Sequence, residues 1–191
     1  MKVEVIMSCM NQTDGSIISD SNLNDENVLV VNQVRDAEEK LLEFNSKHRM
    51  INTPTRGLSV SRNIAVDNTK GDICVLADDD EVFENNLSEI VTDAYSKLPD
   101  ADIIAFSVKN LNCKLKSTMH RLKGFEIYRV ASVQISFKTR SVKGKVRFDE
   151  KIGSGTNYGS GEDNKFMKDC YKQKLKIYYY PVNIATLNNG E

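Results

Sequence analysis

A chain of 191 residues, of which 40% are hydrophobic, is long enough to bury the core of one domain of ordinary size. Its 26 basic and 27 acidic side chains give a formal net charge of -1, which offers no electrostatic support for nucleic acid as a partner. The start of the chain lacks the apolar core of a signal peptide, and no stretch approaches the ~20 apolar residues of a membrane span. The four cysteines are scattered without a CxxC pair, as is typical of buried thiols in a reducing cytoplasm, so we expect a cytoplasmic protein.

The first part of the chain alternates short apolar runs with polar segments. The runs at 3–7, 28–31, 50–51 and 73–76 predict strands. We expect polar turns over 12–26, and a short exposed helix or an irregular connection over 35–47. Before the fourth run, Ser59 is a suitable N-cap for a helix that should end near Lys70, with Gly71 in the left-handed conformation.

The fourth apolar run is the centre of the predicted fold. It does not alternate, which is typical of a strand covered on both faces in a parallel sheet of an α/β protein. Asp78, Asp79 and Asp80 follow it almost at once, and the carboxyl ends of such strands are where open α/β sheets bind ligands. Adjacent carboxylates cost stability, and Mg²⁺ or Mn²⁺ would offset that cost. An isolated triplet of this kind is more often a solvated acidic turn, so the metal interpretation depends on its context.

The rest of the chain continues the α/β pattern. We expect a helix over 87–98, a buried strand over 103–108, a basic and poorly periodic region over 109–129, a half-buried strand over 133–137 and a late strand over 175–180. The basic region either contacts an anionic acceptor or is a solvated loop. A Gly-rich loop then delivers Glu162 and Asp163 to the start of a helix, where two acids could also do no more than complement the helix dipole. We expect mobility over a bound ligand at five loop residues, Gly153, Ser154, Gly155, Gly159 and Gly161.

Three stretches together carry a family resemblance. The run GLSVSRNIAVDNTKGDICVLADDDE resembles the core of family-2 glycosyltransferases of the GT-A fold, with its Gly-x-Ser-x-x-Arg-Asn loop, Gly-Asp turn, apolar strand and DxD-type cluster. SGEDNKF is similar to the Glu-Asp catalytic element of that family, and VEVIMSCMNQ to its first strand. The commonest sequence of this motif in the family is Leu-Asp-Ser-Asp-Asp, whereas residues 76–80 are Leu-Ala-Asp-Asp-Asp. Which acid binds the metal therefore stays open, although Asp80 keeps its place under either alignment.

The resemblance implies a set of site residues. Asp163 is the expected general base, Glu162 orients it or the acceptor, and Asp78 and Asp80 are the expected ligands of Mg²⁺ or Mn²⁺. Relatives carry Asp where this chain has Asn32 and Gln33, whose amides can still hydrogen-bond a uracil edge. The residues expected to contact the nucleotide sugar are Ser8, Met10, Asn11, Asn32, Gln33, Arg56, Ser59, Arg62, Asp78 and Asp79. Arg62 would neutralise the charge of a leaving diphosphate, whereas Arg56 could equally form a surface ion pair.

The resemblance also implies the architecture and the reaction. We expect a single α/β domain over 1–191 with a Rossmann-like, mostly parallel central sheet flanked by helices. Its nucleotide-sugar-binding half would cover about 1–108 and its acceptor and catalytic half about 109–191. Relatives usually continue with further helices, so the chain would be a minimal or a C-terminally truncated catalytic core.

The implied activity is that of an inverting, metal-dependent hexosyltransferase. It would move a sugar from a nucleotide-diphosphate donor, expected to be a UDP-sugar, to a hydroxyl of a carbohydrate or lipid-linked glycan acceptor in surface or capsular polysaccharide synthesis. Membrane contact, if any, would be peripheral. Two alternatives stay open: a non-catalytic GT-A subunit of a larger transferase, and a sugar nucleotidyltransferase.

Overall fold

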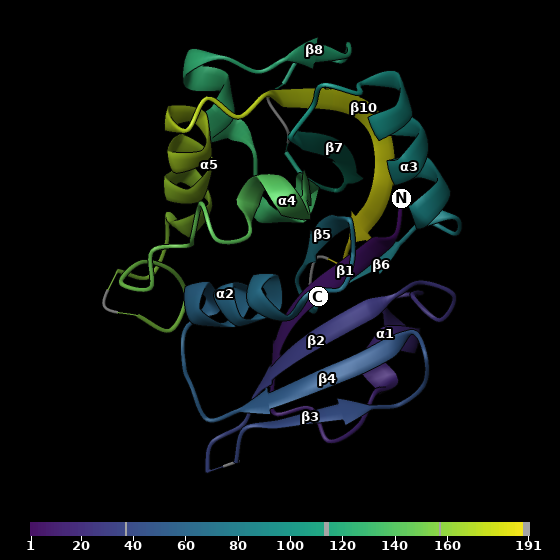
Figure 1. Cartoon of the computed structure of the whole chain (residues 1–191), viewed down its shortest axis with the longest axis vertical. Coiled ribbons are helices and arrows are strands. Elements are labelled where there is room, and N and C mark those ends of the chain that lie inside the picture. The colour runs from purple at the N-terminus through teal and green to yellow at the C-terminus, as the bar shows by residue number, and fades with distance from the viewer. Residues whose placement is uncertain (37, 113–114, 157, 189–191) are drawn as a thin grey trace.

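A computed structural model describes residues 1–36, 38–112, 115–156 and 158–188, and joins its strands in one sheet (Figure 1). The strand order is β3-β4-β2-β1-β5-β9-β7-β10-β6, and β8 pairs with β10 outside this path. This arrangement confirms the predicted α/β domain with a central sheet.

The parallel half of the sheet contains the apolar runs of the first part of the chain. Strand β1 (Val3–Met10) pairs in parallel with β2 (Val28–Gln33) and with β5 (Ile73–Ala77), and β2 pairs in parallel with β4 (His48–Thr53). Almost every side chain of β1, β2 and β5 is buried, because both faces of this half are covered. The carboxyl ends of these strands therefore meet at one edge of the sheet.

The other half of the sheet is mixed. Strand β7 (Ile103–Lys109) runs parallel to β10 (Ile177–Leu187), and β9 (Ile135–Lys138) lies antiparallel between β5 and β7. Strands β6 (Glu81–Phe83) and β8 (His120–Arg121) are antiparallel to β10, and β3 (Lys40–Glu43) is antiparallel to β4 at the opposite edge.

Helices cover both faces of the sheet and divide the core into two clusters. Helix α3 (Leu87–Lys97) packs with Val5 and Met7 on one face, whereas α2 (Leu58–Asn68) and α5 (Glu162–Lys172) pack with Ile6 on the other. In Figure 1, α3 lies on the right of the sheet and α2 and α5 on the left. The shorter helices are α1 (Ser16–Asp20), α4 (Thr139–Val142) and the 3-10 turns η1 (Gly124–Arg129) and η2 (Ser132–Gln134).

Several local predictions were wrong. The segment 35–47 contains the edge strand β3, not a helix. Helix α2 begins at Leu58 with Gly57 at the N-cap, because the Ser59 hydroxyl donates to the Ile152 carbonyl oxygen at 2.6 Å instead of capping the helix. The helix ends at Asn68 without a left-handed glycine.

Later elements also differ from their predicted form. Strand β9 is buried along its whole length, not half-buried, because it is inserted between β5 and β7. Strand β10 continues past Pro181 to Leu187, since its pairing with β7 shifts register between Tyr180 and Asn183 and so tolerates the missing amide hydrogen.

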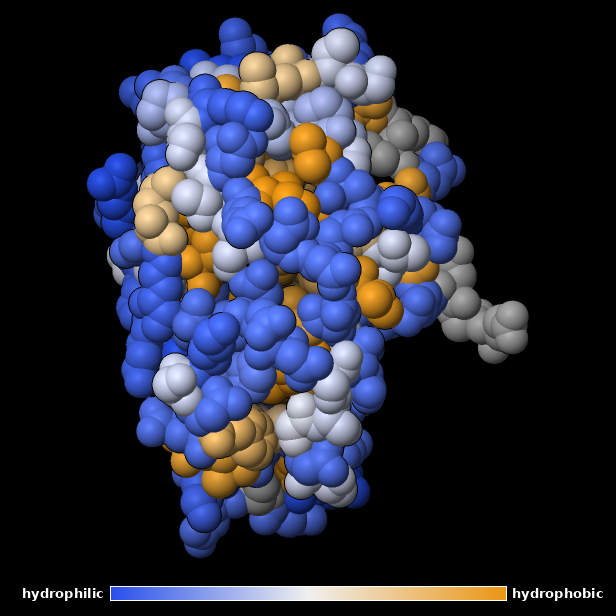
Figure 2. All heavy atoms as spheres, turned by 90° about the vertical axis from the view of Figure 1, so that its right-hand side faces the viewer, coloured by the Kyte–Doolittle hydropathy of each residue, from blue (hydrophilic) through white to orange (hydrophobic). Residues whose placement is uncertain are grey.

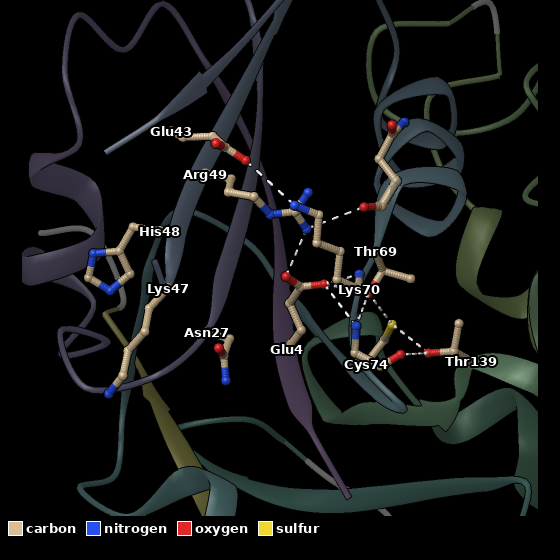
Figure 3. A network of polar contacts seen from close by, with 12 residues as sticks. Glu4, Asn27, Glu43, Lys47, His48, Arg49, Thr69, Lys70, Cys74 and Thr139 are labelled. Carbon is tan, nitrogen blue, oxygen red and sulfur yellow. Dashed lines mark hydrogen bonds and ion pairs between the residues drawn. The ribbon is translucent and has the colours of Figure 1, made fainter. Parts of the chain in front are cut away.

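A buried polar network ties the connection after α2 to the amino-terminal end of the sheet (Figure 3). The Glu4 carboxylate of β1 accepts hydrogen bonds from Arg49 Nη2 of β4 at 2.8 Å, from Thr69 Oγ1 at 2.6 Å and from the Lys70 amide at 2.6 Å. Burial alone would raise the pKa of Glu4, but these hydrogen bonds and the Arg49 charge outweigh it, so the pKa lies below its usual value. Gly71 lies so close that a Cβ there would be 2.8 Å from the Cβ of Glu4. Close approach, not a left-handed backbone, is therefore what requires glycine at position 71.

The surface shows no single large apolar region on the side that carries α3. Hydrophilic side chains cover most of this side, and apolar side chains lie in separate small patches (Figure 2). Within the described residues, no helix combines the length and the apolar character that crossing a membrane requires.

Candidate active site

The acidic triplet lies on the wall of a cavity at the carboxyl ends of the parallel strands. Asp78, Asp79 and Asp80 follow β5, in the position that the sequence predicts for them. The cavity has a volume of about 470 Å³, and we call it the strand-end cavity. Its lining residues are Ser8, Cys9, Met10, Gln33, Arg56, Gly57, Leu58, Asp78, Asp79, Asp80, Ser154 and Gly155.

Arg62 of α2 joins this triplet to the second acidic pair. Its Nη2 donates to Asp78 Oδ1 at 2.9 Å, and its Nη1 donates to Asp163 Oδ1 at 2.7 Å. The same Nη1 lies 3.8 Å from Glu162 Oε1. Arg62 is only 2% exposed, so its charge acts in a poorly hydrated place between the carboxylates. Two acidic motifs that are far apart in the sequence thus share one cation.

Ser132 of η2 makes a second connection between the two acidic motifs. Its amide donates to Asp163 Oδ2 at 2.9 Å, and its hydroxyl donates to Asp78 Oδ2 at 3.3 Å. Both oxygens of Asp163 therefore have protein donors that fix the orientation of the carboxylate. Ser132 was not among the predicted site residues, since nothing in its local sequence distinguishes it from other loop serines.

A fourth carboxylate, Glu81, lies beneath the triplet. It is almost fully buried, and its Oε2 accepts the Asp78 amide hydrogen at 2.8 Å. Burial, helped by the nearby charges of Asp78 and Asp80, raises the pKa of Glu81 to about 9. Burial also raises the pKa of Asp79. The sequence analysis missed Glu81, although it occupies the same inward face of β6 as the buried Phe83.

The structure brings together most of the predicted nucleotide-contacting residues, but not all of them. Asn11, Asn32, Ser59 and Arg62 do not line the strand-end cavity. The Asn32 amide is fully buried and is bonded to the backbone of Gln12 and the side chain of Asn52, and Gln33, although in the lining, holds the backbone of Gly57. The contacts predicted between these residues and a nucleotide stay predictions.

The carboxylates of the cavity suit a metal ion that is held jointly by the protein and the substrate phosphates better than one held by protein ligands alone. Among the residues that the structure describes, no group of three or more His, Cys, Asp or Glu side chains is arranged to hold a metal ion on its own. Asp78 is already paired with Arg62, whereas the Asp79 and Asp80 side chains are exposed to the cavity. Mg²⁺ is commonly held by one or two carboxylates together with substrate phosphates, and this set of donors suits that arrangement.

Comparison with known proteins decides the family. The family described as Glycosyl transferase family 2 matches residues 3–153, most of the chain. The chain belongs to glycosyl transferase family 2. No curated protein matches this family-2 chain.

Solved structures confirm the GT-A fold of this family-2 chain. The crystal structure of S. aureus TarS 1-349 matches with a TM-score of 0.68 and 16% identity, over 98% of this chain and 60% of that one. The same TarS segment in complex with UDP-GlcNAc matches with a TM-score of 0.68 and 17% identity, over 100% of this chain and 60% of that one. The longer TarS structure is covered to 36%. The family-2 chain described here therefore spans less than two thirds of these proteins, and the likeness concerns the fold.

Proposed function

We propose that this chain transfers a sugar from a nucleotide-diphosphate donor, a UDP-sugar, to a hydroxyl of a glycan acceptor with inversion at the anomeric carbon. The observation that carries the proposal is the Arg62 bridge, which joins Asp163, the base of the proposed reaction, to Asp78 of the strand-end cavity. Family membership and the UDP-GlcNAc complex of TarS support a nucleotide sugar as the donor. We place the reaction in the cytoplasm, in the synthesis of a surface or capsular polysaccharide.

Each group has a distinct part in the proposed reaction. Asp163 takes the proton of the acceptor hydroxyl while the acceptor oxygen bonds to the anomeric carbon and the bond from that carbon to the diphosphate oxygen breaks. UDP leaves with the bonding electron pair. Asp80, with Asp78 or Asp79, would hold Mg²⁺ or Mn²⁺, which supplies Lewis-acid stabilisation of the leaving diphosphate. Arg62 and the Ser132 amide keep the Asp163 carboxylate in one orientation.

Calorimetry with UDP tests the donor site. Binding should be weak in EDTA and should recover with Mn²⁺ or Mg²⁺, because the diphosphate and the acids of the cavity repel each other without a cation. Asp80→Ala should weaken binding more than Asp79→Ala. The control is Asp93→Ala on α3, a helix on the face of the sheet opposite to α2. This variant should bind UDP as the wild type does. Equal affinity with and without metal would refute the metal role.

Product analysis separates the alternatives. Incubation with UDP-sugars should release UDP, slowly with water as the acceptor. Release of pyrophosphate from a sugar phosphate and a nucleoside triphosphate would indicate a nucleotidyltransferase instead. UDP binding without any turnover would indicate a non-catalytic subunit.

Asp163→Asn tests the base. The substitution keeps the size of the side chain but removes its ability to accept a proton, so kcat should fall on the order of 100-fold or more. Metal-dependent UDP affinity should stay within a few-fold, since Asp163 does not line the strand-end cavity. A near-normal transfer rate would exclude Asp163 as the base and make Glu162 the next candidate.

A further inference from the structure

A second cavity opens beside Asp163 and shares no described lining residue with the strand-end cavity. It has a volume of about 310 Å³, and we call it the helix-end cavity. Residues 128–131, at the end of η1 and just after it, form one wall, and residues 160–164, around the start of α5, form the other. Asp163 lines this cavity, and its carboxylate is linked through Arg62 to Asp78 of the strand-end cavity. The two cavities are thus connected by the hydrogen bonds of Arg62 to one lining residue of each.

The polar groups of the helix-end cavity favour a ligand that donates hydrogen bonds. Glu162 and Asp163 contribute two carboxylates, which accept hydroxyl protons and repel phosphate or carboxylate groups. The Glu162 Oε2 atom is buried and has no hydrogen-bond partner among the residues that the structure describes. A buried acceptor without a partner is costly unless a ligand or water satisfies it. Arg129 also lines the cavity, but it already has an interaction within the protein.

The apolar groups of the same cavity favour a ligand with a flat apolar face. Tyr128 lines the cavity and is 41% exposed. Its neighbour Phe125 is 86% exposed, and the two ring centroids lie 6.5 Å apart. Aromatic rings of this kind would be buried if their role were to stabilise the core. A pyranose ring combines an apolar face of C–H groups with hydroxyls at its edge, which matches this pairing of rings and carboxylates.

We propose that the helix-end cavity binds the acceptor, and that this acceptor presents an uncharged pyranose there. The apolar face of the sugar packs on Tyr128, and a hydroxyl donates to Glu162. A neighbouring hydroxyl then lies toward Asp163, the base of the proposed function on which the catalytic part of this inference rests. Tyr128 is in this view a specificity-determining residue that acts on acceptor binding and not on the donor.

Binding of simple sugars to the wild-type protein and to three variants tests the site directly. The probes are methyl pyranosides of glucose, galactose and N-acetylglucosamine, and ligand-observed NMR reports their binding. Tyr128→Ala should weaken the binding of the best probe about tenfold, a typical effect of removing a stacked ring. Tyr128→Phe keeps the ring and should bind within about twofold of the wild type. Tyr171→Ala is the matched control, because Tyr171 is 42% exposed but lies outside the cavity, near the end of α5.

A kinetic arm separates this proposal from the proposed function. KM for the pyranoside should rise about tenfold in Tyr128→Ala and stay near the wild-type value in Tyr171→Ala, whose hydrolysis of a UDP-sugar without acceptor should equal that of the wild type. If no UDP-sugar is hydrolysed, the proposed function fails, but the NMR result still tests whether the helix-end cavity binds a pyranoside. Failure of every probe to bind the wild type, or equal binding by Tyr128→Ala, would overturn the acceptor site.

Discussion

Arg62 is the cation that the two acidic motifs of the site share. Its guanidinium hydrogen-bonds Asp78 and Asp163, and its carbon Cζ lies 5.5 Å from the centroid of the Phe148 ring. The predicted contact of this cation with a diphosphate stays a prediction, and in the structure the guanidinium is bonded to the two carboxylates. The donors on its two terminal nitrogens reach the two carboxylates at once, whereas the donors of a lysine all lie on one nitrogen.

Replacement of Arg62 should therefore lower both stability and activity. Arg62→Met leaves partly buried carboxylates without a counter-charge, so the free energy of unfolding should fall by about 3 kcal/mol, at the low end for buried pairs. Arg62→Lys keeps the charge and should cost less stability, yet it should still impair turnover because its single nitrogen does not reproduce the contacts that two nitrogens make with Asp78 and Asp163. Urea denaturation and UDP release measure the two effects. Arg147→Met, which removes an exposed pair with Asp67, is the control and should cost less than about 1 kcal/mol. Unfolding energies equal to that of the control would show that the bridge contributes no stability.

The acids of the candidate site could be predicted from the sequence, but their connections could not. The position of the triplet after a buried strand follows from local pattern alone. The Arg62 bridge joins residues that are 101 positions apart, and such a contact has no local signal. The burial of Asn32 could not be predicted from the sequence either. A side-chain amide near the end of a strand can face a cavity or, as here, hydrogen-bond the backbone of a neighbouring turn.

At the scale of elements, strands with apolar runs were predictable and strands with polar residues were not. Strand β3 reads KLLE and lies at the sheet edge, where exposed charged side chains are common, so its sequence resembles an exposed helix. Strand β9 alternates as a half-buried strand would, but Ser136 is buried and hydrogen-bonded to the hydroxyl of Tyr95 and to the carbonyl oxygen of Ile104. A polar residue that alternates with apolar ones in a strand is thus not always exposed to solvent.

The contact between β1 and β4 through Glu4 and Arg49 predicts how stability depends on pH. The pKa of folded Glu4 lies below its usual 4.5, so the carboxylate contributes its full stabilisation above that value and loses it as the pH falls through the folded pKa. Glu4→Gln leaves Arg49 buried without its charged partner, which should cost about 3–5 kcal/mol near pH 7. Because this variant has already lost the contribution of Glu4, its deficit relative to the wild type should shrink in acid.

Urea titrations of both proteins near neutral pH and at about pH 3 measure that difference. Glu43→Gln, which removes an exposed pair with Lys70, is the control and should change stability little at either pH. A deficit of Glu4→Gln that is the same at both pH values would contradict the role of Glu4 ionisation.

At the scale of the whole molecule, the buried thiols report on the integrity of the core. Cys9, Cys74 and Cys170 are free and buried, and burial raises the pKa of Cys9 to about 12 and that of Cys74 to about 11. Burial raises the pKa of Cys170 as well. Thiolates are the reactive form, so these cysteines should resist thiol reagents in the folded protein. Cys113 lies outside the described residues.

Labelling of a Cys113→Ser variant with a chromogenic disulfide reagent tests this expectation. The three remaining thiols should react only as fast as the protein unfolds, and urea should accelerate the reaction in step with the loss of circular dichroism. Immediate reaction of Cys74 or Cys170 in native buffer would show that part of the core opens without global unfolding, whereas immediate reaction of Cys9 would show that the reagent reaches it through the strand-end cavity.

The pairing of β10 with β6 has a practical consequence for anyone who modifies this protein. Leu187 pairs with Glu81, and the Asn188 amide donates to the Asp80 carbonyl oxygen at 2.9 Å, so the chain passes beside the acidic triplet at its last described residues. Met1, by contrast, precedes β1 at the amino-terminal ends of the parallel strands, whereas the triplet follows the carboxyl end of β5. A histidine tag joined directly after Asn188 would start next to the donor acids, and its imidazoles could compete for the same cations. A tag placed before β1 would avoid this competition.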